Sequence, residues 1–515
     1  MENITAAARY KRMVGKRDPF LRRAREAATL TIPSLFPPEN HSGHDKLPTP
    51  YQGLGARGLN NLVAKMTLAL MPPNSPFFRL SVDDYTLEKM VEDEGMRAAV
   101  EEALGAIERA AMHYIEENGK RVAAGEGLKQ LFIAGNVMLY LSPEGRMKVY
   151  RLDRYVVRRD PMGSVLEHIT KESIAYEALP KNVQEFVESK AQTKGKRKPE
   201  DLLDLYTRVY LEDDKWHVYQ EIEDKEVPGT RGTYPKDRSP WMPLRFTQID
   251  GEDYGRGYVE EYLGDLKSLE ALTKAIIEGS AAAAKVLFFV HPNGVTKVRT
   301  VAESESGDVR TGDANDVSVL QMDKFADFRV AMETSNAIES RLSYAFLLNT
   351  AVQRAGERVT AEEIRYVAKE LEDALGGVYS VLSQEFQRPF VKRVLHDMQQ
   401  KKKIPALPKG TVTPTITTGL EALGRGHDLQ KLDAFILGVQ QQLGPEAVAK
   451  HLHVDDYLKR RATALGIDIK GLVRTEQEIQ QEMAEQKQQE QMEGMAGMAM
   501  ETGMDMLRET AKGGM

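Results

Sequence analysis

The chain has 515 residues, a formal net charge of −7 and no cysteine. This length corresponds to about two to four domains, and the absence of cysteine excludes disulfides and thiolate metal sites. The acidic balance argues against a generally basic nucleic-acid-binding protein. The polar segment 1–21 lacks the apolar core of a signal peptide, and no run of about 18 apolar residues occurs, so we expect no contact with a membrane.

Helical patterns dominate the first third of the chain. Apolar residues recur every three or four positions over residues 59–70, 91–115 and 122–133. Strand patterns follow in pairs that flank short turns, and we interpret these pairs as β-hairpins. The predicted hairpins are 137–141 with 148–152, 155–157 with 165–169, and 205–211 with 216–221. The basic segment 190–200 is interpreted as a solvated surface insertion.

The middle of the chain predicts one helix that leads out to a small β-rich unit and a second helix that leads back. The first helix covers residues 258–284 and ends in the small residues Gly279 to Ala284, which permit close packing of neighbours. Strand patterns at 286–290 and 317–320 flank a polar loop. The second helix covers about 325–347.

A charged loop then leads into a long helix. The loop presents polar side chains on a Gly-containing segment: Gln353, Arg354, Glu357 and Arg358. Thr360 followed by Glu363 forms a capping box that marks the start of the helix. At about 1.5 Å per residue, a helix over 361–388 would span about 40 Å. We expect Gly376 and Gly377 to kink this helix, and Pro389 to end or kink it.

The C-terminal part has a different composition. Residues 415–417 predict a strand, and residues 429–465 predict helix. Beyond Thr475 the chain is rich first in Gln and Glu and then in Met and Gly, which favours a flexible tail. The alternative is a Met-rich docking helix that orders only against a partner.

Candidate chemical motifs lack the structural context that they need. The segment Gly53 to Gly58 matches a dinucleotide fingerprint, but Pro48 and Pro50 precede it where a buried strand is required, so we interpret it as a helix-entry turn. Each Gly-Lys pair is followed by Arg rather than Ser or Thr, which excludes a phosphate-binding loop. His451 and His453 share a face only on a strand, whereas their context predicts helix. We therefore expect no catalytic site, cofactor or metal.

Several motifs recur in a fixed order along nearly the whole chain: Thr31 to Pro37, Gly55 to Leu62, Ala134 to Val137, Tyr254 to Arg256, Glu260 to Leu266, Gly356 to Tyr366, and Thr418 to Ala422. Together they resemble the portal, or head-to-tail connector, proteins of short-tailed bacteriophages that encode a single-subunit RNA polymerase. The likeness is weakest at 192–198, at 300–313 and beyond Thr475.

The resemblance implies a mainly helical α+β portal fold that assembles as a ring, usually a dodecamer, at one capsid vertex. Its parts would be the following: the wing (1–257), the stem helices (258–284 and 325–348), the β-rich clip (285–324), the tunnel loop (349–359), a long kinked helix with a return to the wing (360–430), a helical crown (431–475) and a flexible tail (476–515). The protein would be made in the host cytoplasm and would reside in the virion, where double-stranded DNA is packaged and later ejected through the ring.

The resemblance also implies partners and a role for the tunnel loop. The partners would be further copies of the chain, double-stranded DNA, a separate terminase motor, major capsid and scaffolding proteins, tail adaptor and tail proteins, and internal core proteins. Our hypothesis is that Arg354 and Arg358 touch passing phosphates, while Gln353 and Glu357 line the same constriction. The alternative is that these residues pair between neighbouring subunits and only fix the loop.

Two other classes of protein stay open at this point. A non-viral helical scaffold or interaction protein would agree with the Gln-, Glu- and Met-rich C-terminus. A packaging ATPase or nuclease is disfavoured because the sequence has no phosphate-binding loop.

Overall fold

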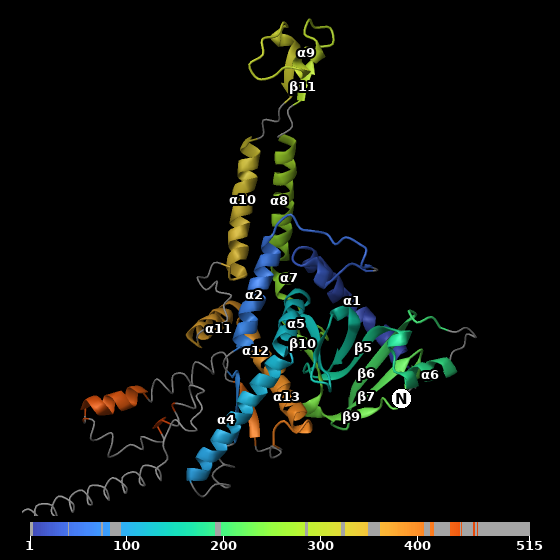
Figure 1. Ribbon diagram of the computed structural model, residues 1–515, viewed down its shortest axis with the longest axis vertical. Helices are drawn as coiled ribbons and strands as arrows, with labels where there is room; N and C mark the ends of the chain where they lie inside the picture. Colours follow the sequence, from blue (N-terminus) through green and yellow to red (C-terminus); the bar gives the residue numbers. More distant parts are fainter. Residues whose placement is uncertain are drawn as a thin grey trace, which may run out of the picture. The chain divides into compact units, whose positions relative to one another are not determined.

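The computed structural model describes residues 4–39, 41–73, 76–82, 94–190, 197–283, 287–320, 325–348, 361–405, 412–416, 433–442, 444, 457–458 and 461. The chain divides into two compact units, one of residues 1–88 with 107–420 and one of residues 89–106 with 421–515. In the second unit, residues 433–442 are helical, within the range predicted as helix. The rest of this section concerns the first unit, which mixes helices and strands (Figure 1).

The strands of the first unit form two larger antiparallel sheets. The first sheet has the order β4-β5-β6-β7-β8, and β9 also pairs with β7. Its strands are β4 (Tyr155–Arg159), β5 (Val165–Ala175), β6 (Leu202–Glu212), β7 (Lys215–Ile222), β8 (Lys225–Glu226) and β9 (Gly232–Pro235). The second sheet has the order β10-β2-β3, from β10 (Trp241–Arg245), β2 (Asn136–Leu141) and β3 (Met147–Tyr150). All three predicted hairpins are confirmed, as β2 with β3, β4 with β5, and β6 with β7.

Helix α1 (Ala6–Thr29) covers one face of the first sheet. Its residues Ala6, Ala7 and Tyr10 form a buried cluster with Val156, Ile169 and Tyr206 of the strands. Alanines make much of this contact, so α1 has no pronounced apolar stripe. For this reason the sequence pattern did not predict the helix. A short helix, α6 (Lys181–Lys190), follows β5 in the chain.

Two helices, α2 (Leu54–Leu70) and α5 (Lys120–Ala134), pack against each other, and α5 also contacts β2 and β3 of the second sheet. Helix α4 (Glu94–Glu117) precedes α5 in the chain. Leu59, Leu62 and Met66 of α2 are fully buried. The helix begins at Leu54, directly after Gly53, which confirms the helix-entry interpretation of the glycine-rich segment. A Cβ atom on Gly55 would lie 2.2 Å from the Leu30 carbonyl oxygen, so this position has room only for glycine.

The predicted helix–β–helix order is present. Its helical parts are α7 (Tyr258–Glu261), α8 (Leu263–Ala283) and α10 (Phe325–Ala345), and α8 and α10 lie side by side (Figure 1). Between α8 and α10 in the chain come β11 (Leu287–Val290), the short helix α9 (Val298–Ala302) and β12 (Val317–Leu320), and the two strands pair antiparallel.

The segment predicted as one helix over 361–388 is interrupted. It consists of α11 (Ala361–Leu375), α12 (Val378–Leu382) and a π-helical turn (Ser383–Gln387), after which α13 (Arg388–Gln400) continues. Pro389 lies in the first turn of α13, where its missing N–H is not needed. Strand β13 (Val412–Ile416), close to the predicted strand at 415–417, pairs with β1 (Phe78–Val82).

Candidate functional site: the end of helix α10 and its anchor on α2

The predicted tunnel-loop residues Gln353, Arg354, Glu357 and Arg358 lie outside the described residues, and so do His451 and His453. The described chain ends at Leu348 and resumes at Ala361. What the structure does describe is how the two flanking helices, α10 and α11, are held. The residues that hold them form a set that we call the α10 anchor: Asn61, Lys65, Tyr258, Phe346, Leu347 and Glu370.

The end of α10 turns sharply at Leu347. This residue has a φ angle of +54°, in the left-handed region that usually requires glycine. The N–H of Leu348 donates to the Ser343 carbonyl at 2.8 Å, which is the bond of a Schellman cap. A leucine in this conformation costs about 1–2 kcal/mol in strain. Leu347 is only 8% exposed, so burial of its side chain offsets that cost.

Side chains from other helices satisfy the last carbonyl groups of α10. Asn61 Nδ2 donates to the carbonyl oxygens of Phe346 at 3.0 Å and Leu347 at 2.9 Å. The Tyr258 hydroxyl donates to the Ala345 carbonyl at 2.8 Å. Carbonyls at a helix end lack partners inside the helix, so these contacts replace water and fix the direction in which the chain leaves α10.

Aromatic packing holds the same point from a second side. The ring of Phe346 lies 6.1 Å from that of Tyr258 and 6.0 Å from that of Tyr262, measured between centroids. Gly58 of α2 faces this ring, and a Cβ atom there would lie 2.6 Å from Phe346 Cγ. Gly58 therefore allows the close approach of α2 to the end of α10. Both glycine and aromatic ring belong to one packed contact.

Lys65 links the end of α10 to α11. Its Nζ atom lies 3.0 Å from the Leu347 carbonyl oxygen and 3.0 Å from Glu370 Oε2. The side chain of Lys65 is 7% exposed and that of Glu370 is 14% exposed. Removal of one partner alone from a buried ion pair of this kind lowers the stability of a protein by about 3–5 kcal/mol. One ammonium group thus connects the two helices that flank residues 349–360.

The glycines expected to kink the long helix lie in the turn between α11 and α12. Gly376 has a φ angle of +58°, a backbone conformation that suits glycine, and Gly377 follows it before α12 begins. Beyond α12, Gln387 of the π-helical turn donates to the Leu70 carbonyl at 2.5 Å. Helix α2 therefore contacts the long segment both at α11 and at the π-helical turn.

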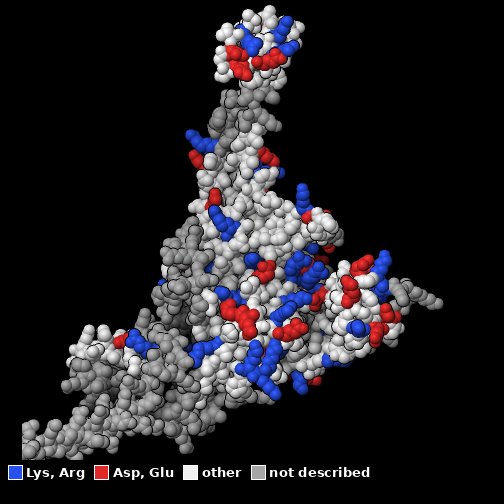
Figure 2. All heavy atoms as spheres, viewed as in Figure 1, with Lys and Arg blue, Asp and Glu red and all other residues white. Residues whose placement is uncertain are grey.

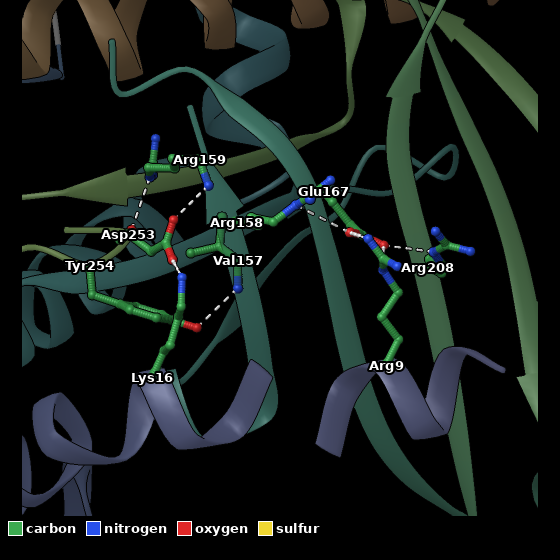
Figure 3. A network of polar contacts seen from close by, with 9 residues as sticks. All are labelled: Arg9, Lys16, Val157, Arg158, Arg159, Glu167, Arg208, Asp253 and Tyr254. Atoms are coloured by element: carbon green, nitrogen blue, oxygen red, sulfur yellow. Dashed lines mark hydrogen bonds and ion pairs between the residues drawn. The ribbon is translucent and has the colours of Figure 1, made fainter. Parts of the chain in front are cut away.

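A separate polar network fastens α1 to the first sheet (Figure 3). Glu167, which is fully buried, pairs with Arg9 at 2.5 Å and with Arg208 at 2.7 Å. Asp253 pairs with Lys16 of α1 at 3.2 Å and accepts the backbone N–H of Arg159 at 2.7 Å. Burial lowers the pKa of Arg159 to about 10. Both carboxylates are paired with cationic side chains of other elements, so the network fastens α1 to the sheet.

The described residues show no grouping suited to metal binding. Among them, no cluster of three or more His, Asp and Glu side chains could hold a metal ion. His168 is fully buried, and burial lowers its pKa to about 3, so this histidine is neutral at ordinary pH. None of the helices in the described part of the chain combines the length and apolar character that a membrane crossing needs.

Sequence reasoning did not find the α10 anchor. Asn61 and Lys65 are four residues apart, so they share one face of α2, and that spacing was the only available signal. A lysine in an apolar helix normally points to solvent, so the sequence does not predict a buried position for Lys65. Its partners lie about 280 to 305 positions further along the chain.

Comparisons with known proteins cover almost the entire chain. A family model described as "Bacteriophage head to tail connecting protein" matches residues 3–473. The portal protein of Escherichia phage T7 is 47% identical over 503 residues, which are 96% of this chain and 91% of that protein. The portal protein of Enterobacteria phage T3 is 48% identical over 481 residues, with 92% and 89% covered. The portal protein of Enterobacteria phage SP6 is 31% identical, with 93% and 91% covered.

Proposed function

Because the chain belongs to the bacteriophage head to tail connecting protein family, we propose that its copies form a ring-shaped channel at one vertex of a viral capsid. Its function is that of a viral portal, which links head to tail. The observation that carries this function is identity of 47% and 48% to two portal proteins over nearly the full length. The protein is a structural connector rather than an enzyme.

We propose that the ring has twelve copies and that double-stranded DNA passes through it during packaging and ejection. The charge of the chain supports a channel through which DNA slides. A channel that neutralised many phosphates would hold DNA tightly and in a salt-dependent way, whereas this chain has a net charge of −7. On the face drawn in Figure 2, acidic and basic side chains are interspersed rather than gathered by sign.

The tunnel loop, residues 349–359, is proposed as the constriction of this channel. Arg354 and Arg358 would contact phosphates, and Gln353 and Glu357 would line the same ring of charge. The α10 anchor supports this proposal because it fixes the point from which the loop begins, so that every copy would present its loop at the same radius. The turn at Gly376 and Gly377 would then let α11 adjust the aperture without moving α13.

The proposed partners follow from the position of a portal in a virion. The β-rich clip, residues 285–324, would receive a separate terminase motor during packaging and tail adaptor proteins afterwards. The wing would contact the major capsid and scaffolding proteins. The crown, residues 431–475, would face the capsid interior and the internal core proteins.

Two experiments test this function. Electron microscopy of the purified full chain should show rings with a central hole in axial views, and monomers or filaments would contradict the proposal. For the constriction, Arg354→Ala with Arg358→Ala should change the length of packaged DNA or its retention in assembled particles. Lys11→Ala with Arg12→Ala is the matched control, because it removes the same charge from an exposed surface of α1. Unchanged DNA content in the tunnel-loop variant would refute the contact role.

A further inference from the structure

The paired strands β11 and β12 form a two-stranded ribbon, residues 287–290 with 317–320, whose one face is apolar throughout. In the antiparallel register, Phe288 pairs with Val319 and Val290 pairs with Val317. Directly opposite residues share a face, and positions two apart along a strand do so too. These four side chains therefore form one face of the ribbon, which we call face A. Phe288 is 60% exposed and Val319 is 50% exposed.

The opposite face of the ribbon is also open. Phe289 pairs with Ser318 on this side, which we call face B, and Phe289 is 54% exposed. Strands that bury only one face alternate between apolar and polar residues, whereas a continuous apolar run is typical of a strand covered on both faces. Residues 287–290 read Leu-Phe-Phe-Val, with no polar residue. The sequence is thus typical of a strand that is covered on both faces, whereas in the part of the chain that the structure describes Phe288, Phe289 and Val319 are all at least half exposed.

In residues 287–320, polar contacts rather than a buried apolar core hold the segment together. Thr296 is the one side chain less than a tenth exposed among those described in residues 287–320. Its hydroxyl donates to the Asp313 carbonyl at 3.0 Å, and its backbone N–H donates to Asp316 Oδ2 at 2.9 Å. Gly294 packs so closely on Asp316 that a Cβ atom would lie 2.4 Å away. An isolated two-stranded ribbon is marginal in water, so this one needs an apolar partner.

We propose that the ribbon packs between the ribbons of two neighbouring copies of this chain, with face A of one copy against face B of the next. This inference rests on the proposed ring and names a contact within it. In a closed ring each subunit touches two neighbours through two different surfaces. A ribbon with two different apolar faces supplies one surface for each neighbour.

A second copy of the chain fits this surface better than a different protein does. A motor or tail protein that docks from one side covers one face and leaves the other in water. Neighbouring copies cover both faces at every position of the ring. The side chains described on the two faces carry no charge, so neither face opposes the stacking of one copy on the next.

The absence of native cysteine makes a direct test possible in the full chain. Phe288→Cys puts a thiol on face A, and Ser318→Cys puts one on face B, on opposite sides of the ribbon. In assembled rings a short bismaleimide should join the double variant into a ladder of covalent oligomers up to the full ring. Each single variant should stay mostly monomeric, because face A does not meet face A. Val309→Cys, which is 98% exposed outside the ribbon, replaces one member of the pair as the control.

Three results would overturn the inference. The first is a ladder no stronger than that of Phe288→Cys with Val309→Cys. The second is efficient dimer formation by either single variant, which would indicate like faces in contact. The third comes from maleimide labelling of Phe288→Cys, which should slow at least tenfold in the ring relative to separated subunits. Equal labelling rates, or protection only after a motor or tail protein is added, would show that another protein covers this face.

The test separates this contact from the ring itself. Rings that are visible by electron microscopy but give no ladder and no protection would refute the ribbon contact alone. Failure of the unsubstituted chain to form rings would refute the proposed function. Val319→Cys serves as a second face A variant where Phe288→Cys does not assemble.

Discussion

The clearest quantitative prediction concerns Lys65 and Glu370, the ion pair of the α10 anchor. Lys65→Met keeps most of the side-chain volume of a lysine but removes the ammonium group 3.0 Å from Glu370. The carboxylate of Glu370, in a side chain 14% exposed, would then lose this charge partner in a poorly solvated site. Loss of one member of a buried pair costs about 3–5 kcal/mol. We expect Lys65→Met to lower the free energy of unfolding by about 3 kcal/mol.

Removal of both charges should restore much of that loss. Lys65→Met with Glu370→Met removes both charges of the pair, and apolar replacements of a buried ion pair are often neutral or stabilising. The Leu347 carbonyl loses the Lys65 donor but keeps the Asn61 amide at 2.9 Å. We therefore expect the double variant to lie within about 1 kcal/mol of the unsubstituted chain. The coupling energy should then be about 2 kcal/mol or more.

The assay is denaturant unfolding of the full chain and its variants, followed by tryptophan fluorescence. The two tryptophans, Trp216 and Trp241, lie on β7 and β10 in the same unit as the anchor. Asn61→Ala is an informative companion, because it removes two neutral hydrogen bonds and should cost about 1–3 kcal/mol without any rescue by Glu370→Met. Simple addition of the two single effects in the Lys65 and Glu370 double variant would refute the argument for a coupled buried pair.

Three further predictions concern packing, pH and the attachment of α1. Gly58→Ala should destabilise the fold by about 1–3 kcal/mol, because its Cβ atom would lie 2.6 Å from the Phe346 ring; thermal unfolding measures this, and an unchanged midpoint would contradict the close packing. Burial lowers the pKa of Lys120 from 10.5 to about 8. The folded state thus binds this proton less tightly than the unfolded state does. The charged lysine therefore destabilises the fold by its full amount below pH 8, and this destabilisation disappears by about pH 10.5. Lys120→Met should therefore raise the free energy of unfolding by about 1–2 kcal/mol at pH 7, after allowance for solvent screening. Unfolding curves measured across pH should show this increase becoming smaller above pH 8. Glu167→Gln leaves its arginine partners without a carboxylate, so the amides of α1 should exchange with solvent at least tenfold faster, and unchanged exchange would mean that the network does not hold the helix.

The hairpins could be predicted from sequence because their pairing is local. Strands β6 and β7 flank Asp213 and Asp214, whose φ angles of +48° and +56° fit the tight turn that acidic residues tolerate. The pairing of β10 with β2, and of β1 with β13, joins segments about 100 and 330 residues apart, and no local pattern encodes such partners. An interruption of the helix at Gly376 could be predicted from the residue type alone, because glycine adopts positive φ angles that other residues avoid.

The anchor escaped prediction for a reason that also explains its structure. Asn61 and Lys65 can satisfy the Leu347 carbonyl only because α2 passes beside the end of α10, and that approach depends on Gly58, seven positions before Lys65 on the same helix face. Glycine, amide and ammonium are each unremarkable alone. Together they hold Leu347 at a φ angle of +54°, a backbone conformation that leucine disfavours on its own.

Helices α10 and α11, which flank residues 349–360, share the contact with Lys65 but otherwise differ in the interactions that hold them. Neutral hydrogen bonds and aromatic contacts fix the end of α10, together with the Lys65 ammonium group that also reaches α11. Helix α11 is held by the buried face that contains Val367 and Leu371 and by the ion pair of Glu370 with Lys65. The Lys65–Glu370 pair is buried, so salt screens it less than it would screen an exposed pair. In the proposed ring, residues 349–359 would thus start from an end of α10 that is fixed by several contacts, and they would lead into α11, whose turn at Gly376 allows it to change direction.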